Sequence, residues 1–511
     1  MTDTASPQTA PTPVRPGYRY YVLAMLILVY MLNFLDRQII GILAAPLKAE
    51  FGLSDSQFGL LGGIAFASVY STLAIPLAAL ADRASRVWIM TGALAVWSGF
   101  TALCGVAQNF TQLFLFRMGV GVGEAGGVAP AYSLVADYFP PEQRARALAG
   151  FAFGIPLGTA AGTLVGGLLA ASYGWRTAFI VVGLLGLLVA PLLRLTVKDP
   201  PRGGTDVAKA AAVPPPVDAA PVAPAAKARS ERVGRFASGL MIGIAIGCLA
   251  LAGLDRFAGV ETGNALVYLF AGLLALVIGV SFWIARATAS VVLPKPSFWL
   301  LALGAASSSV CGYGVAGWLP LFFMRSFDLT LAQTSWYYSG IALIGGILGI
   351  WGGGFIADKL GKRGKGAYPL TPAVAFLISA PLFIAAMNSP WIIGLVLPGG
   401  GSQAAQLTLA FLIFLIPTGL NLAWLGPITA AIQHIAPAPM RSTASAVFLL
   451  FNNLLGIAVG FYYFGWMSDL LAPRFGDESL RWAIYTGMGF YLLAAVLLIG
   501  ASRTLKRDWV E

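Results

Sequence analysis

Charged residues, cysteines and histidines are all scarce in this sequence. Only 10% of its 511 residues are charged and 58% are hydrophobic, whereas about a quarter of the residues of a soluble domain are charged. The three cysteines all lie in apolar stretches, and there is one histidine, so neither a disulfide framework nor a metal cluster is expected. This composition excludes an ordinary soluble domain and indicates an integral membrane protein.

The sequence also lacks the motifs of enzymes and of ATP-driven machines. We find no recognisable serine–histidine or cysteine–histidine set, no metal-ligand spacing and no GxxxxGKS/T phosphate loop. We therefore expect no enzymatic activity, cofactor or metal, and any work would draw on an ion gradient. The net charge of +11 does not indicate nucleic-acid binding, because the basic residues recur in alternate short loops, where they set the orientation of a multi-pass membrane protein.

Long apolar runs make up most of the chain instead. They reach the roughly 20 residues that a helix needs to cross a bilayer and do not resemble the short alternating strands of a barrel. We predict an all-α membrane protein with 14 apolar segments, in the order six, two and six. The twelve main segments are expected at about 20–47, 57–81, 87–107, 111–137, 143–171, 175–195, 297–325, 332–357, 367–387, 405–434, 441–468 and 480–502.

These segments divide the chain into domains. They are a disordered N-terminal segment (1–19), a six-helix bundle (20–197), a Pro/Ala-rich linker (198–235), an accessory helical pair (236–296), a second six-helix bundle (297–502) and a tail (503–511). The accessory pair is either two spanning helices or one interfacial hairpin. We expect it to span, because a hairpin would still have to bury two runs of about 20 apolar residues.

Lysine and arginine predict the orientation. They gather in the loops that share a side with both termini, so we expect these loops, the linker and both termini to be cytoplasmic. The protein would lie in the cell membrane, which is the inner membrane in a Gram-negative organism.

A short charged motif occurs once in each half of the chain, directly after the second span. The motif residues are Asp82, Arg83 and Arg86 in the first copy and Asp358, Lys359, Gly361, Lys362 and Arg363 in the second. The motif resembles the cytoplasmic loop motif of the major facilitator superfamily, although the earlier copy departs from it at Ala78, Ser85 and Val87. The resemblance implies a gate that closes the cytoplasmic side in one conformation. Orientation signalling by the basic residues alone is the alternative.

Three further stretches resemble one branch of that superfamily. NFLDRQIIG in the first span, the run from Arg117 to Phe151 with its GVGEAG, and GWRTAF at 174–179 are similar to the Spinster-like transporters. That branch includes carriers of lysolipids and of sphingosine-1-phosphate. The resemblance implies two six-helix halves around a cavity that opens alternately to each side. The Asn-x-x-Asp-Arg pattern alone would not decide, because carboxylate transporters of the anion:cation symporter branch share it.

Four ionisable residues lie inside the predicted spans, away from their ends: Asp36 and Arg37 in the first span, and Arg117 and Glu124 in the fourth. At about 1.5 Å of rise per residue, Asp36 and Arg117 are expected at similar depth and Glu124 about 10 Å deeper, near the midplane. A buried carboxyl group in a membrane helix can bind and release protons near neutral pH. We expect Asp36 and Glu124 to carry protons, and Arg37 and Arg117 to hold either a carboxylate or an anionic head group. A purely structural ion-pair cluster is the alternative.

The second half has aromatic and amide side chains where the first has charges. An uncharged aromatic wall facing a charged one suits an amphipathic ligand. We expect a monomeric, proton-coupled transporter of amphipathic lipids, with protons and membrane lipids as its other partners. The alternatives are an exporter or symporter of small organic anions or drugs, and a membrane sensor that does not transport. The expected cavity-lining residues are Tyr313, Trp318, Tyr337, Asn421, Trp424, Phe448 and Asn452.

Overall fold

The computed structural model describes residues 16–202, 265–361, 364–396, 401–437 and 440–510, together with isolated positions between 232 and 250. Every regular element within these ranges is a helix. Residues 1–15 of the predicted N-terminal segment, most of the linker and most of the first accessory run (236–254) lie outside the described residues. Residues 16–19, which were predicted to be disordered, instead form the first turn of α1, where the Tyr18 hydroxyl bonds to the end of α10.

The helices of the first half begin at Pro16. They are α1 (Pro16–Ile42), α2 (Ala44–Phe51), α3 (Asp55–Gly59), the π-helical turn Leu60–Ile64, α4 (Ala65–Ala81), α5 (Arg86–Cys104), α6 (Phe110–Glu124), α7 (Val128–Tyr138), α8 (Pro141–Ala152), α9 (Gly154–Tyr173) and α10 (Trp175–Thr196). Several predicted spans are therefore two consecutive helices: the first breaks after Ile42, the fourth after Glu124 and the fifth after Ala152.

Within the described residues, the later helices begin with α13 and then repeat this plan from α14 onward. They are α13 (Ala265–Val292), α14 (Pro296–Ser326), α15 (Leu331–Gly361), α16 (Ala367–Met387), α17 (Ser389–Val396), α18 (Gln403–Asn421), α19 (Leu425–His434), α20 (Arg441–Asn453), the π-helical turn Leu454–Val459, α21 (Gly460–Phe475), the 3-10 turn Gly476–Glu478 and α22 (Ser479–Asp508).

Eleven helical stretches of the described chain are long and apolar enough to cross a membrane. This count is lower than the predicted 14 for three reasons. The break after Glu124 leaves α6 and α7 too short to count, and the last two segments form one stretch from Thr443 to Asp508. Most of the first accessory run lies outside the described residues.

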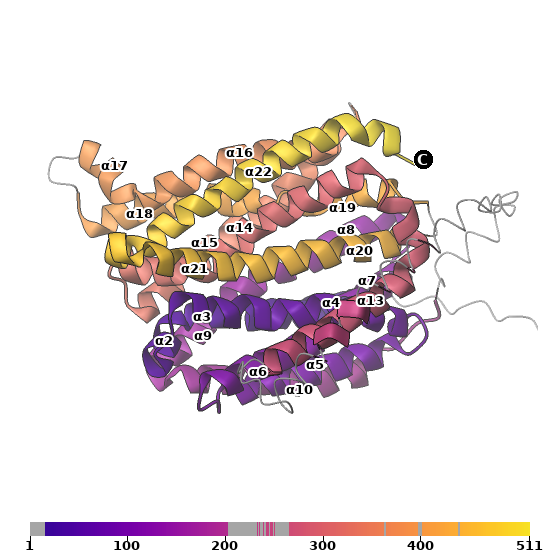
Figure 1. Cartoon of the computed structure of the whole chain (residues 1–511), viewed down its shortest axis with the longest axis horizontal. Helices are drawn as coiled ribbons and strands as arrows, with labels where there is room; N and C mark the ends of the chain where they lie inside the picture. Colours follow the sequence, from indigo (N-terminus) through magenta and orange to yellow (C-terminus); the bar gives the residue numbers. More distant parts are fainter. Residues whose placement is uncertain are drawn as a thin grey trace, which may run out of the picture.

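The helices run roughly parallel along the long axis of the molecule (Figure 1). In that view α3, α4, α5 and α10 lie below, and α16, α21 and α22 lie above. Tyr18 near the start of α1 donates to the Thr196 carbonyl at the end of α10 (2.9 Å), and the Ser297 N–H at the start of α14 donates to Asp508 (3.3 Å). We call this end of the bundle the terminal end, and the end that holds α2 and α3 the opposite end.

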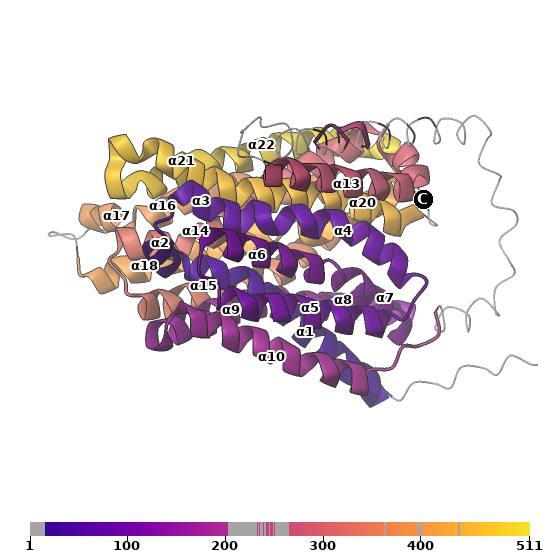
Figure 2. The ribbon, with the colours of Figure 1, turned by 60° about the horizontal axis from the view of Figure 1, so that its bottom comes forward.

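Helix α13 bridges the two halves. It packs against α4 of the first half and α20 of the second, and in Figure 2 it lies alongside α20 with α4 next to it. The Ser281 hydroxyl donates to the carbonyl of Thr72 on α4 (3.0 Å), and the rings of Phe282 and Phe451 are 6.1 Å apart. This second member of the predicted accessory pair is thus packed into the bundle.

Close contact between α1 and α9 fixes the helix that carries Asp36 and Arg37. A Cβ atom on Gly158 would lie 2.2 Å from the Met31 carbonyl oxygen, and one on Gly162 would lie 2.6 Å from the Leu35 carbonyl oxygen. Small residues at such positions let two membrane helices approach to backbone contact. The position of α1 therefore depends on glycines that are far from it in the sequence.

Candidate functional site

The structure brings Asp36, Arg37, Arg117 and Glu124 together in the interior of the first half. Their exposed fractions are 2%, 9%, 1% and 0%. Arg117 and Glu124 are seven residues apart on α6 and so lie on nearly the same face of that helix.

Glycines of α6 let the neighbouring helices close around this cluster. A Cβ atom on Gly121 would meet the Phe66 carbonyl oxygen of α4 at 2.7 Å, and one on Gly123 would meet the backbone nitrogen of Trp97 on α5 at 2.4 Å. The GVGEAG stretch therefore has a packing role, which is to bring three backbones together around Glu124.

The two acids are paired differently. Arg37 donates from Nε to Oε2 of Glu124 at 2.8 Å. Arg117 donates from Nη1 to the backbone carbonyl of Asp36 at 3.3 Å, which places these two residues side by side. Among the described residues, Oδ1 of Asp36 and Oε1 of Glu124 are buried without a hydrogen-bond partner. Glu124 therefore has a direct cationic partner. Arg117 holds the backbone of Asp36, and the side chains that reach the Asp36 carboxylate are those of Thr101 and Trp97 on α5.

Aromatic rings hold the Arg37 guanidinium in place. Its Cζ atom lies 5.0 Å from the ring centre of Phe34, 5.0 Å from that of Phe66 and 4.4 Å from that of Tyr70. A cation over an aromatic face is attracted by the ring electrons, and more strongly where water is excluded. These rings offset part of the cost of burying a charge and fix the plane of the guanidinium.

A cavity of about 130 Å³ lies beside this cluster, between the two halves. Arg37, Gln38, Phe66 and Arg117 line it from the first half. The facing wall is uncharged, and its polar and aromatic members are Ser309, Tyr313, Tyr338, Thr418, Asn421, Trp424 and Phe461. One wall of the cavity can therefore bind an anion, while the other offers ring faces, hydroxyl groups and an amide.

The expected cavity residues separate into two groups. Tyr313, Asn421 and Trp424 line the cavity, whereas Trp318, Tyr337, Phe448 and Asn452 are not among its lining residues. Trp318 donates from Nε1 to the Phe461 carbonyl at 2.9 Å, Asn452 accepts from the Ser309 hydroxyl at 2.9 Å, Phe448 packs on Trp424, and Tyr337 packs between Phe323 and Phe411.

Gln38 and Phe66 line the cavity without having been identified from the sequence. A glutamine directly after an intramembrane Asp-Arg pair is a signal that could have indicated Gln38. Phe66 gives no such signal, because its position depends on the approach of α4 to α6.

At the terminal end, the motif residue Arg86 is buried among several partners. It is 1% exposed, whereas Asp82 and Arg83 are exposed. Arg86 donates from Nε to Asp199 (2.9 Å) and from Nη1 to the Ser133 hydroxyl (2.9 Å), and it also contacts Asp137. This arginine thus ties the start of α5 to α7 and to the segment after α10.

The second copy of the motif is only partly described. Lys359 is exposed at the end of α15. The side chains of Asp358 and Gly361, and residues Lys362 and Arg363 as a whole, lie outside the described residues. The partners Asp137 and Asp199 of the first copy were missed by sequence reasoning, because nothing in their local sequence indicates a contact with Arg86.

At the opposite end, Asp55 links the two halves. It is 4% exposed and accepts two hydrogen bonds from Arg325 at the end of α14, both 2.9 Å, and one from the Ser468 hydroxyl on α21 (2.7 Å). Asp469 accepts from the backbone N–H groups of Asp55 (3.0 Å) and Ser56 (2.7 Å). These bonds join the start of α3 to the second half.

Lys48 also reaches this network. Burial and the neighbouring Arg325 guanidinium lower the pKa of Lys48 to about 8, although its ammonium group contacts Asp55. Sequence reasoning missed the network because its members lie at helix ends, outside the central parts of the spans. The S-D-S-Q stretch from Ser54 to Gln57, which forms a capping box, is the signal that marks the helix start where Asp55 lies.

The sequence matches a family model described as Major Facilitator Superfamily over residues 26–460. A protein named MFS-type efflux pump from Mycolicibacterium smegmatis is 29% identical over 97% of this chain and 95% of its own length. Protein spinster homolog 1 from Homo sapiens is 27% identical over 96% of this chain and 83% of its own length.

A solved transporter structure is also similar to this chain. The chain is 28% identical to a bacterial homologue of the human lysosomal transporter Spinster, solved in an inward-facing and unoccupied conformation. The match has a TM-score of 0.68 and covers 98% of this chain and all of that one. The chain therefore belongs to the major facilitator superfamily of membrane transporters, in its Spinster-like branch.

Proposed function

We propose that the protein is a proton-coupled secondary transporter of an amphipathic lipid, of the lysophospholipid or sphingoid-phosphate type. It works by alternating access in the cell membrane, with the terminal end facing the cytoplasm. One observation carries the proposal: the guanidinium of Arg37 both lines the cavity and holds the buried carboxylate of Glu124.

That shared arginine couples the proton to the substrate. When Glu124 takes up a proton, its attraction for Arg37 falls, and the guanidinium becomes available to a phosphate or carboxylate in the cavity. When Glu124 loses the proton, it competes with the bound anion for the same cation. Two ligands that bias one two-state element are coupled by an equal free energy in both directions. Asp36 serves as the second proton site, and Arg117 as the second contact for the head group.

The facing wall supports an amphipathic substrate. Tyr313, Tyr338 and Trp424 present ring faces, and Asn421 is the amide among the lining residues of this wall. An acyl or sphingoid chain can lie along these rings while its head reaches the arginines. A sugar would require more hydrogen-bonding groups than this wall offers.

The two ends of the bundle supply the gates. The network of Arg86 with Asp137 and Asp199 orders the motif loop at the terminal end. The bonds of Asp55 with Arg325 and Ser468 hold the halves together at the opposite end. In alternating access the contacts at one end form while those at the other end break.

A small organic anion or a drug is the second candidate substrate. The name of the Mycolicibacterium relative, an efflux pump, and the volume of about 130 Å³ favour it, because this space holds a head group more easily than a whole lipid. Transport of such a small substrate would not require an extended aromatic wall in the cavity.

The test is flux through the purified protein in proteoliposomes. A labelled lysophospholipid and a polar organic acid are compared, with and without a pH gradient. We expect gradient-driven flux of the lysolipid, its loss in Glu124→Gln, and its retention in the control Glu478→Gln, whose carboxylate pairs with Arg481 at the protein surface. Parent-like gradient-driven flux in Glu124→Gln would refute the proposed coupling, and flux of the organic acid alone would favour the second candidate.

A further inference from the structure

The aromatic ring of Phe461 lies between two glycines that belong to different halves of the chain. Phe461 stands near the start of α21, is 4% exposed and lines the cavity between the halves. A Cβ atom on Gly62 of the first half would overlap Cδ1 of this ring, and one on Gly317 of α14 would overlap Cε1. Gly62 and Gly317 therefore form a slot that the ring fills, which we call the glycine slot.

A second ring on α21 is held in a similar way, but inside one half. Phe464 lies three residues further along and is fully buried. A Cβ atom on Gly314 of α14 or on Gly487 of α22 would overlap its ring, and both of these glycines belong to the second half. Phe464 is not among the residues that line the cavity. The two phenylalanines are thus a matched pair, because Phe464 packs helices of one half together and Phe461 joins the two halves.

Backbone contacts between the halves surround the glycine slot. A Cβ atom on Gly63, in the π-helical turn of the first half, would meet the carbonyl oxygen of Ala458, in the π-helical turn of the second half, at 2.8 Å. One on Gly41 of α1 would meet the Gly317 carbonyl oxygen at 2.9 Å. Turns of this kind are rare and often occur at functional sites. Because the glycine slot takes one residue from each half, it exists only while these backbones touch.

The ring lies between the cavity and the ion-pair network of the opposite end. On three helical segments a network residue lies seven or eight positions from the ring or from its glycines, and these pairs are Phe461 and Asp469, Gly317 and Arg325, and Gly62 and Asp55. This spacing corresponds to about 10–12 Å along a helix. Phe58, between Asp55 and Gly62, packs edge to face on Trp318 of the second half, with ring centres 5.3 Å apart. A substrate that leaves the cavity towards the opposite end meets Phe461 first.

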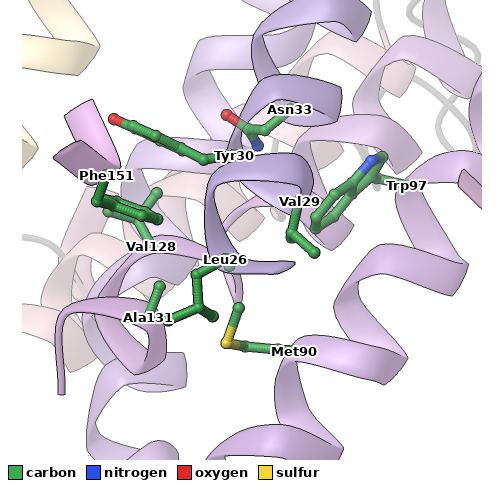
Figure 3. Close-up of a pocket in the computed structure, with 10 residues that line it drawn as sticks. Leu26, Val29, Tyr30, Asn33, Met90, Trp97, Val128, Ala131 and Phe151 are labelled. Atoms are coloured by element: carbon green, nitrogen blue, oxygen red, sulfur yellow. The ribbon is translucent and has the colours of Figure 1, made fainter. Parts of the chain in front are cut away.

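A smaller pocket on another side of α1 offers no alternative site for a substrate (Figure 3). Its volume is about 10 Å³, and Leu26, Val29 and Phe151 are among the side chains around it. That space is about the lower limit for one water molecule, whereas the cavity that Phe461 lines has a volume of about 130 Å³. The passage that needs a gate is therefore the one from this larger cavity.

We propose that Phe461 is the gate residue that closes the cavity towards the opposite end. Its ring blocks the passage while the halves touch at this end, and it leaves the glycine slot when they separate. Since Gly62 moves with the first half and Gly317 with the second, a rigid movement of one half against the other opens the slot without any change inside either half. The proposal rests on the alternating access of the proposed function.

The accessibility of a cysteine inside the cavity tests this gate. Ala316 on α14 lines the cavity next to Gly317, so the Ala316→Cys protein carries a reporter on the cavity side of the ring. A membrane-impermeant anionic methanethiosulfonate is added to right-side-out and to inside-out vesicles, and reaches the protein from one end in each. The same proteins without the reporter give the background from the native cysteines, of which Cys104 and Cys311 are buried.

We expect slow labelling of the reporter from the opposite end when Phe461 is present, and labelling several-fold faster in Phe461→Ala. The control is Phe464→Ala, which also deletes a buried ring from α21 and should also lower the melting temperature, but should label as slowly as the parent. From the terminal end all three proteins should label at similar rates. Equal rates in Phe461→Ala and the parent, or in Phe461→Ala and Phe464→Ala, would overturn the proposal.

A second variant leaves the ring in place and removes its slot. In Gly62→Ala the new Cβ atom would overlap the Phe461 ring, so the ring must move and labelling from the opposite end should again be several-fold faster. Gly314→Ala, which displaces Phe464 within the second half, is the control and should label like the parent. If Phe461→Ala does not fold, this pair decides, and parent-like labelling of Gly62→Ala would then overturn the gate.

These readings are separate from those of the flux experiment. Labelling requires neither a substrate nor a pH gradient, so a protein that carries no lysolipid would still show the difference between Phe461→Ala and Phe464→Ala. If the difference appears in the other vesicle preparation, the orientation assigned to the chain is wrong, and the gate is still supported.

Discussion

Arg37 donates a hydrogen bond from Nε to the buried carboxylate of Glu124 at 2.8 Å, and the same guanidinium lines the cavity between the halves. One cation is thus within reach of a fixed carboxylate and of the cavity. In the proposed mechanism, a proton on Glu124 determines whether this carboxylate or a bound anion has the stronger attraction for Arg37.

The Arg37→Lys variant tests whether the shape of this cation matters. Lysine keeps the charge but loses the planar guanidinium that stacks on Phe34, Phe66 and Tyr70, and it cannot donate two parallel hydrogen bonds. We expect binding of an anionic amphiphile to weaken about tenfold, which corresponds to about 1.4 kcal/mol. Isothermal titration in detergent measures the affinity. Arg481→Lys, at a surface pair with Glu478, is the control, and an equal loss in both variants would contradict this role for Arg37.

The bonds of Asp55 with Arg325 are expected to hold the opposite end closed. The Asp55→Asn variant removes a largely buried ion pair that has two parallel hydrogen bonds. If this pair contributes about 1.4 kcal/mol, the fraction of molecules with the opposite end open should rise about tenfold. Electron paramagnetic resonance between spin labels on the α2–α3 loop and on the loop before α15 gives this population.

A double-mutant cycle isolates the contact. Arg325→Gln alone should open the same end, and adding it to Asp55→Asn should have little further effect, because residues in one ion pair are not additive. Fully additive effects of the two substitutions would show that the pair itself does not determine closure.

Asp199 gives a prediction about acid stability at the terminal end. Burial alone would raise the pKa of Asp199, but hydrogen bonds from Arg86 and Ser85 outweigh it and lower this pKa below its usual value. A carboxyl group with a lowered pKa in the folded state contributes stability above its ordinary pKa of about 4, and this contribution is lost as the pH falls through the folded value. The Asp199→Asn variant should therefore have a melting temperature a few degrees below that of the parent at pH 7. This difference in melting temperature should become smaller below pH 4. A melting-temperature difference that stays constant down to pH 3 would contradict a stabilising role for the ionised Asp199 carboxylate.

Gly158 lies where α9 packs against α1. A Cβ atom there would lie 2.2 Å from the Met31 carbonyl oxygen, so Gly158→Ala must push α1 away from α9 and displace Arg37 with it. We expect lower thermal stability together with reduced transport. The matched control is Gly99→Ala on α5, where a Cβ atom has open space within 4 Å, and this helical change should be neutral or stabilising by up to about 1 kcal/mol. Similar melting temperatures for the two variants would mean that α1 and α9 adjust freely.

The cavity shows where sequence reasoning reached its limit. Tyr313, Asn421 and Trp424 line it. Trp318 and Asn452 are of the same residue types and lie in predicted spans that also supply lining residues, but they bond to Phe461 and Ser309 instead. The residue type shows only that a side chain is suited to lining such a cavity. Which side chains do so depends on the rotation of each helix about its axis, which is set by contacts with helices far away in the sequence.

By itself the sequence determined the membrane class, the helical architecture and the family, because a scarcity of charge and a repeated run of about 20 apolar residues leave few other solutions in a bilayer. It also determined the four charged residues inside the spans, because burying a charge in a membrane is costly enough to make each one conspicuous. Only the tertiary structure decided that Arg37 pairs with Glu124 while Arg117 binds the backbone of Asp36. It alone decided as well that Asp55 at the start of α3 bonds to Arg325 at the end of α14. The physical reason is that these pairings depend on the approach of helices 80 or more residues apart, down to backbone contact at single glycines, and no local pattern in the sequence encodes such a distance.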